Sequence, residues 1–259
     1  MTTPDMTALD FRPAPGAAPV IRQIGAQTRM ELRLLLRNGE QLLLTIVIPT
    51  LLLIVFAKAP IADLPKPRVD FLVPGVLALA VMSTAFTGQA IATGFERRYG
   101  VLRRLGTSPL PRGGLLTAKT AAVLAVEVLQ VALLVVVGLA LGWSPHGSAA
   151  KALFLLVLGT IAFSALGLLM AGTLRAEATL AAANLIYLLL LVLGGVAFPL
   201  SDFGSGVRHV LELLPIAALT DGLRAAMSSS GSLPVHDVVT LCVWGLVMGV
   251  LAARLFRWE

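Results

Sequence analysis

Residues 96–112 read ERRYGVLRRLGTSPLPR, and they lie between two long apolar runs at residues 71–94 and 114–141. A helix rises about 1.5 Å per residue, so each run is long enough to cross a bilayer core of roughly 30 Å. The basic stretch is too polar to enter that core. We expect the helix of the first run to continue through it and to end at Gly106, with Pro109 beyond. This arrangement predicts membrane-spanning helices joined by a basic segment at the membrane surface.

The composition extends this prediction to the whole chain. Of its 259 residues, 57% are hydrophobic and only 13% are charged, and the mean hydropathy is +0.90. A soluble domain needs more charge than this to cover its surface. We therefore predict an all-α polytopic membrane protein with six transmembrane helices. The six apolar runs occupy residues 42–57, 71–94, 114–141, 152–172, 180–198 and 238–256.

The distribution of Lys and Arg predicts the orientation of the chain. An even number of spans places both termini on one side of the membrane, and that side holds 14 of the 20 Lys and Arg residues. Cytoplasmic loops carry an excess of these residues, so we expect both termini in the cytoplasm. The same distribution accounts for the net charge of +6 without a nucleic-acid partner.

Two segments precede the transmembrane domain, which we assign to residues 39–259. Residues 1–20 are rich in Pro and Ala and predict a flexible cytoplasmic tail rather than a cleavable signal peptide. Residues 21–38 predict an amphipathic interfacial helix. Its apolar face carries Ile21, Ile24, Thr28, Leu32 and Leu35, and an adjacent face carries Arg29, Arg33 and Arg37. Such arginines can meet the anionic head groups of membrane lipids. The alternative is a basic extension of the first span.

The segment between the fifth and sixth spans is too polar to cross the membrane and too apolar for an ordinary loop. Its first half carries an apolar face at helical spacing, on Val207, Val210, Leu211 and Leu214. Pro215 interrupts this helix, and residues 216–227 predict a second one. We interpret the pair as outer re-entrant helices, and the alternative is an extracellular loop with some helix.

The basic segment has two interpretations of its own. Arg97, Arg98, Arg103 and Arg104 are typical of residues that anchor a helix end among lipid head groups. Apolar and aromatic residues, however, are interleaved with them. Interface centres combine such residues with arginine, and this pattern favours docking to a partner.

Polar residues inside the apolar runs are candidates for a substrate path. Glu127 lies near the middle of the third run, and intramembrane carboxylates are costly enough to suggest a function. Glu127 would line the path, bind a cationic ligand or carry protons. The alternative is a protonated side chain that bonds to a neighbouring helix. Gln130, one turn away, and Asn184, in the fifth run, are candidate partners and candidate path residues.

The chain lacks the motifs of nucleotide hydrolysis and of metal binding. Residues 113–120 approach a phosphate-binding loop, but Ala118 stands where the motif requires Gly, and the segment opens a membrane span. His146, His209 and His236 have no metal-ligand spacing. We therefore predict that this chain is not an enzyme, binds no metal or cofactor, and relies on another chain for any ATP hydrolysis.

Taken together, these motifs resemble the permease subunits of ABC-2-type transporters, the group that includes the daunorubicin-resistance-type exporters. The resemblance rests on five stretches: ERRYGVLRRL (96–105), SPL (108–110), FP (198–199), LP (214–215) and DGLR (221–224). The length, the amphipathic N-terminal helix and the six spans agree with it.

The resemblance implies a coupling helix that docks on a separate ATPase subunit. The residues implied for this role are Glu96, Arg97, Arg98, Tyr99, Leu102, Arg103, Arg104 and Leu105. The residues implied for the outer re-entrant helices are Pro199, Leu214, Pro215 and Arg224. The resemblance also implies a second permease copy or a related permease, ATP and Mg²⁺ on the ATPase, and a location in the bacterial plasma membrane.

The function predicted from the sequence is the membrane subunit of an ATP-driven exporter for an amphipathic or lipid-like substrate. Two alternatives stay open. The first is a proton-coupled secondary transporter that uses Glu127. The usual signature of such transporters is a pair of similar inverted halves, and the basic segment has no counterpart around residues 174–179. The second is a membrane assembly factor that transports nothing.

Overall fold

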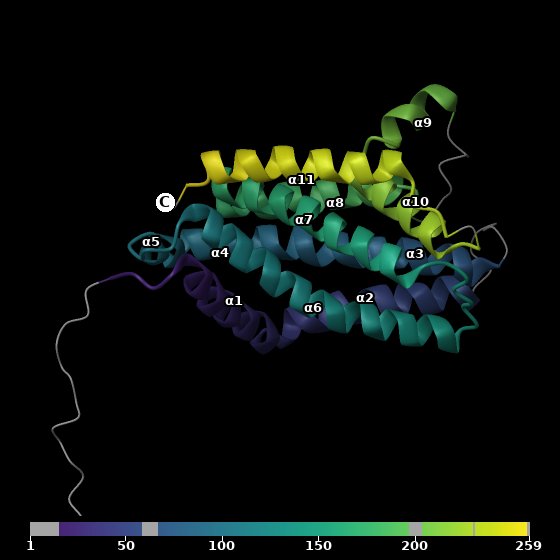
Figure 1. Ribbon diagram of the computed structural model, residues 1–259, viewed down its shortest axis with the longest axis horizontal. Coiled ribbons are helices and arrows are strands. Elements are labelled where there is room, and N and C mark those ends of the chain that lie inside the picture. Colours follow the sequence, from purple (N-terminus) through teal and green to yellow (C-terminus); the bar gives the residue numbers. More distant parts are fainter. Residues whose placement is uncertain (1–15, 59–66, 197–203, 230, 258–259) are drawn as a thin grey trace, which may run out of the picture.

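A computed structural model describes residues 16–58, 67–196, 204–229 and 231–257, and this part of the chain is built from helices (Figure 1). Six of the described helices are long and apolar enough to cross a membrane, which agrees with the predicted fold class. They span Gln41–Lys58, Arg68–Arg98, Arg112–Ala140, Ala149–Thr173, Ala176–Leu193 and Val235–Leu255. Other helices lie at the two ends of the bundle: α1 (Val20–Arg37) and α5 (Val101–Leu105) at one end, and α9 (Ser205–Leu211) at the other.

The second spanning helix is continuous but not uniform. It consists of α3 (Arg68–Val81), the π-helical segment η2 (Met82–Gly88) and α4 (Gln89–Arg98). η2 lies against α7 (Ala149–Thr173). At this crossing a Cβ on Gly167 would stand 2.8 Å from the carbonyl oxygen of Phe86, so only glycine allows the two backbones to approach so closely.

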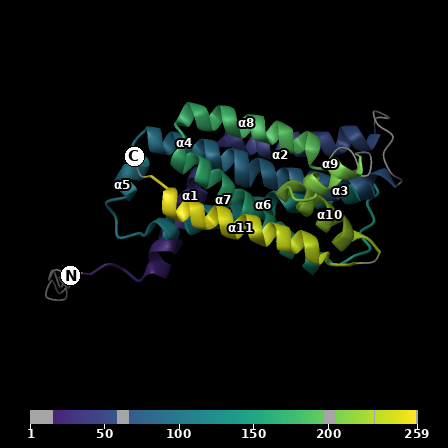
Figure 2. The same cartoon turned by 90° about the horizontal axis from the view of Figure 1, so that it is seen from above.

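α7 is the central helix of the bundle. It packs against η2, α4, α10 (Pro215–Met227) and α11 (Val235–Leu255), and more lightly against α8 (Ala176–Leu193). Figure 2 shows α8 and α11 on opposite sides of it. In the most apolar window of α7, 61% of the residues are buried, compared with 17% in α11. The apolar side chains on the outer helices therefore face outward, as expected for helices that contact lipid or another subunit.

The N-terminal helix is present where the sequence predicts it. α1 covers Val20–Arg37, and a break at Asn38 separates it from α2 (Gly39–Lys58). α1 packs obliquely on α6 (Arg112–Ala140), as Figure 1 shows. The buried residues of α1 are Gln27 and Glu31, whereas Ile21 and Leu34 are exposed. Polar contacts, and not only the apolar stripe, therefore hold this helix on the bundle.

The predicted continuous helix through the basic segment is wrong. α4 ends at Arg98, and Gly100 adopts a left-handed conformation with φ of 73°. A separate short helix, α5 (Val101–Leu105), follows. A glycine in this conformation is a common helix terminator, because residues with a Cβ pay a steric penalty there. The chain then turns through two prolines into α6.

The fifth span also ends earlier than the predicted residue 198. α8 ends at Leu193, and Gly195 has φ of 70°. Both helices predicted between the fifth and sixth spans are present, as α9 (Ser205–Leu211) and α10 (Pro215–Met227), with Leu214 as the cap before Pro215. Their outer, re-entrant position stays a prediction. Pro199 lies outside the described residues. α9 stands away from the bundle in Figure 1.

α10, in contrast, is inserted among the spanning helices. Its apolar face is buried against α3 and α7. Arg224 lies 3.7 Å from the centre of the Phe71 ring, and its Nη1 donates to Asp221 Oδ1 at 3.2 Å. Burial raises the pKa of Asp221 and lowers that of Arg224, and the ion pair between them opposes both shifts. Arg224 thus connects α10 to the start of α3.

Candidate functional site

The turn between α4 and α5 lies at the end of the bundle that also carries α1 and the C-terminus (Figure 1). We call this the α5 end. The eight residues implied for ATPase coupling all belong to this turn or to its flanking helices. Six of their side chains separate into three groups with different surroundings, and the other two, Leu102 and Leu105, make apolar contacts.

The first group ties α4 to the junction of α7 and α8. Arg97 donates from Nη1 to the carbonyl of Ala171 at 2.9 Å and from Nη2 to the carbonyl of Leu174 at 2.7 Å. These oxygens belong to the C-terminal turn of α7, where carbonyl groups lack helical partners and favour a cation. Arg98 pairs with Glu177, in the first turn of α8. The two arginines therefore bond within the chain.

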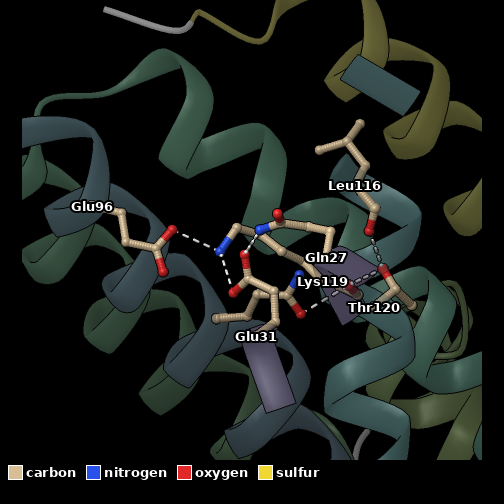
Figure 3. A network of polar contacts seen from close by, with 8 residues as sticks. Gln27, Glu31, Glu96, Leu116, Lys119 and Thr120 are labelled. Carbon is tan, nitrogen blue, oxygen red and sulfur yellow. Dashed lines mark hydrogen bonds and ion pairs between the residues drawn. The ribbon is translucent and has the colours of Figure 1, made fainter. Parts of the chain in front are cut away.

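The second group is a buried ionic cluster that joins three helices, shown in Figure 3. Lys119 of α6 donates from Nζ to Glu96 Oε2 of α4 at 2.7 Å and to Glu31 Oε2 of α1 at 2.9 Å. Gln27 Nε2 donates to the other oxygen of Glu31 at 2.7 Å. The Lys119 and Glu31 side chains are 4% and 8% exposed. Buried charges persist when they are paired and hydrogen-bonded, and these bonds meet that need.

Apolar contacts of Leu102 and Leu105 hold α5 on the bundle. Leu102 is fully buried in a small cluster with Leu110, Leu115 and Phe256. Ile24 of α1 and the half-buried Leu105 pack against this cluster. α5 is thus held against the start of α6, against α1 and against the C-terminal segment.

The third group points away from the bundle. Tyr99 is 71% exposed, and Arg103 and Arg104 are exposed on α5. An exposed aromatic side chain beside arginines is the combination that protein interfaces use as anchors. Together with Arg98, these three are the exposed side chains among the eight residues, and they are candidates for contact with a partner.

The three residues predicted for a substrate path do not come together. Glu127 accepts a hydrogen bond from Thr160 of α7, and neither Gln130 nor Asn184 is its partner. Gln130 Oε1 accepts from the Thr84 hydroxyl at 3.0 Å, and its Nε2 donates to the carbonyl of Thr45 at 2.5 Å. Gln130 therefore joins α6 to η2 and α2.

Asn184 lies elsewhere, on α8. It lines a cleft of about 490 Å³ between α2, η2, α4 and α8, together with Gln41 and Thr87. Of the three predicted path residues, Asn184 alone lines this cleft. Among the residues that the structure describes, no three His, Cys, Asp or Glu side chains are grouped to hold a metal ion.

The comparison with protein families identifies the chain. The family model of the ABC-2 type transporter matches residues 22–228, which covers every described helix from α2 to α10. The chain belongs to the ABC-2 type transporter family. It is accordingly a multi-pass membrane protein and a permease component of an ABC transporter, which transports rather than catalyses. No curated protein matches the sequence with significant similarity.

This ABC-2 permease contains functional candidates that the sequence did not predict. Lys119 is one of the 14 basic residues predicted on the side of the termini, and no role was predicted for Glu31. Lys119 and Glu31 are 88 positions apart, and Lys119 and Glu96 are 23 apart. The one available signal was a lysine within an apolar helix, because such a charge requires a buried partner. Assignment to the daunorubicin-resistance-type group stays a prediction.

Proposed function

We propose that this permease docks a separate ATPase subunit through an exposed surface formed by Tyr99, Arg103 and Arg104. The single observation that carries the proposal is the division of the basic segment. Arg97 and Arg98 bond to α7 and α8, and Tyr99, Arg103 and Arg104 add an exposed surface on the turn and on α5. A segment that only anchored a helix end would not need a separate helix with its own apolar attachment.

The contacts around this surface support mechanical coupling. Force applied to α5 reaches α1, α6 and the C-terminal segment through the Leu102 cluster. Force applied to the end of α4 reaches α7 and α8 through Arg97 and Arg98, and reaches α1 and α6 through Lys119. Movement of a docked ATPase would therefore be distributed to most of the spanning helices.

The charge distribution supports the orientation. The α5 end holds most of the basic residues, so we place it and both termini in the cytoplasm of a bacterial plasma membrane. ATP and Mg²⁺ would bind to the partner ATPase, where hydrolysis occurs.

We further propose outward transport of an amphipathic or lipid-like substrate by a pair of permeases. Support comes from the exposed apolar faces of α2 and α8, which flank the cleft that contains Asn184. A second copy or a related permease on these faces would enclose the cleft as a path between two subunits. Glu127 and Gln130 would then support the helices that border the path.

Purification of the tagged chain from its native membrane in a mild detergent tests the docking surface. We expect a co-purifying chain with a phosphate-binding loop, detected by mass spectrometry, and ATP hydrolysis in the eluate. Arg103→Glu combined with Arg104→Glu should remove both, because it reverses two charges on the exposed face of α5. Monodisperse gel filtration would confirm that the variant is folded.

The matched control reverses two exposed charges at the opposite end, with Lys151→Glu and Arg208→Glu. This variant should retain the ATPase. Retention of the ATPase by the α5 variant would show that the docking surface is wrong. Absence of any ATPase from the wild-type eluate would contradict the proposed pairing of this permease with an ATPase subunit.

A further inference from the structure

A cavity of about 360 Å³ lies between α1, α2, α4 and α6, next to the ionic cluster. This volume is within the range of small-molecule sites in proteins, roughly 300–1,000 Å³. We call it the inner chamber. Its apolar walls come from α1, α2, α4 and α6, and include Leu34, Leu42, Phe95, Val123 and Val126. Asn184 is not among the residues that line it.

Three of the polar groups that line the inner chamber form a stripe on one of its walls. Gln89, Thr93 and Glu96 all line it, and their spacing of four and three residues places them on one face of α4. At about 1.5 Å per residue the stripe is about 10 Å long. It therefore presents an amide, a hydroxyl and a carboxylate in a row.

Two of these side chains each contain one buried polar atom without a hydrogen-bond partner, although Gln89 Oε1 accepts from the Ser164 hydroxyl at 2.9 Å. Gln89 is 5% exposed and Thr93 is fully buried. Gln89 Nε2 and Thr93 Oγ1 have no hydrogen-bond partner among the described residues. A buried polar atom without a partner costs free energy, on the order of 1–3 kcal/mol, which a bound molecule with matching groups would recover.

The charge of the chamber selects the sign of the bound molecule. Of the described residues that line it, three are charged, namely Glu31, Glu96 and Lys119. When all are ionised, their net charge is negative by one unit. Glu31 uses both of its oxygens in bonds to Gln27 and Lys119, whereas Glu96 bonds to Lys119 through Oε2 (Figure 3). The second oxygen of Glu96 is therefore the acceptor available to a cation.

We propose that the inner chamber binds an elongated amphipathic organic amine. Its ammonium group would bond to Glu96 and complete the charge balance of the cluster. A hydrogen-bond acceptor near the other end would bond to Gln89 Nε2, and its apolar body would lie against the leucine and valine walls. This binding role is separate from ATPase docking, since it needs only the permease.

Fluorescence titration with dansylcadaverine tests the proposal. This probe has a primary amine at one end, an apolar linker, and a sulfonyl acceptor beside an aromatic ring. The permease would be reconstituted without ATPase in phosphatidylcholine nanodiscs, and protein-free nanodiscs would measure partition into lipid. We expect saturable binding of dansylcadaverine and binding at least about tenfold weaker for its neutral N-acetylated form, because the charged bond to Glu96 is lost.

Two variants locate the probe in the chamber. Glu96→Gln should weaken binding of the amine by about tenfold or more and leave the acetylated probe unchanged. Ala92→Phe should abolish binding of both probes, because Ala92 lines the chamber and the ring would fill it. Glu212→Gln removes one carboxylate on the opposite side of the bundle, next to α9, and should bind both probes as the wild type does.

Equal binding of the two probes by the wild-type permease would overturn the proposal, and so would the absence of saturable binding. Neither result depends on whether a variant folds. Unchanged binding by a folded Ala92→Phe variant would also overturn it. Loss of the docking surface would leave these titrations unaffected, so the two proposals fail independently.

Discussion

Lys119 and Glu127 are two ionisable side chains on the same helix, and they have opposite environments. They are eight residues apart on α6, or about 12 Å, and each is 4% exposed. Lys119 bonds to two carboxylates from two other helices. Glu127 bonds to the Thr160 hydroxyl through one oxygen, and its Oε1 has no partner among the described residues.

Two equally buried ionisable side chains on one helix are therefore stabilised in different ways. A charge at the α5 end is stabilised by opposite charges, so it can tie α1, α4 and α6 together. In the middle of α6, the partner of Glu127 among the described residues is a hydroxyl and not a cation. We expect the first site to depend strongly on charge and the second to depend mainly on hydrogen bonding.

The largest effect should come from removal of the ammonium group. Lys119→Met leaves Glu31 and Glu96 near each other without a cation, and should lower the free energy of unfolding by about 3–5 kcal/mol. Denaturant titration in detergent micelles measures the change. Adding Glu31→Gln and Glu96→Gln to this variant should recover much of the loss, because no unpaired charge remains. A failure to recover would show that packing rather than charge dominates the cluster.

An intermediate effect is expected at Gln130, one turn from Glu127. Gln130→Leu removes the bond with the Thr84 hydroxyl and the bond to the Thr45 carbonyl. Loss of these neutral bonds should cost about 1–3 kcal/mol in the same titration. Thr84→Val removes one of the two bonds and should cost less. An unchanged Gln130→Leu variant would show that these contacts do not hold α2 and η2 on α6.

The smallest effect should come from Glu127→Gln. Thr160 has one hydroxyl hydrogen, and the carbonyl of Leu156 also accepts from this hydroxyl at 2.8 Å. A glutamine side chain brings an N–H that can donate to the Thr160 oxygen, so the helix contact survives. We expect a change below about 1 kcal/mol. A loss as large as that of Lys119→Met would contradict the comparison and indicate that a charged carboxylate is required there.

The sequence predicted most of the helices because hydropathy and proline positions are local signals. The six spans, the N-terminal helix and the break at Pro215 all follow from such patterns. The two errors occurred at glycines, where Gly100 ends α4 and Gly195 follows the end of α8. Their left-handed conformations depend on how the chain packs beyond the helix, so hydropathy did not indicate them.

The candidate site was less predictable for a different reason. Four arginines in residues 96–104 have the same local sequence context, and this context does not indicate that Arg97 and Arg98 bond to α7 and α8. The partner of Lys119 on α1 was predicted to lie on a lipid-facing helix. Pairing over 88 positions leaves no periodic signal in a single sequence.

Photo-crosslinking at Tyr99 tests the central claim most directly. Tyr99 would be replaced by p-benzoylphenylalanine, which preserves an aromatic ring at this 71% exposed position. The control is the same replacement at Phe154, which is 48% exposed and lies near the N-terminal end of α7, away from the α5 end. Illumination in native membranes should join an ATPase chain to position 99 and not to position 154. A permease that gives no ATPase adduct at position 99, or equal adducts at both positions, would contradict docking at the α4–α5 turn.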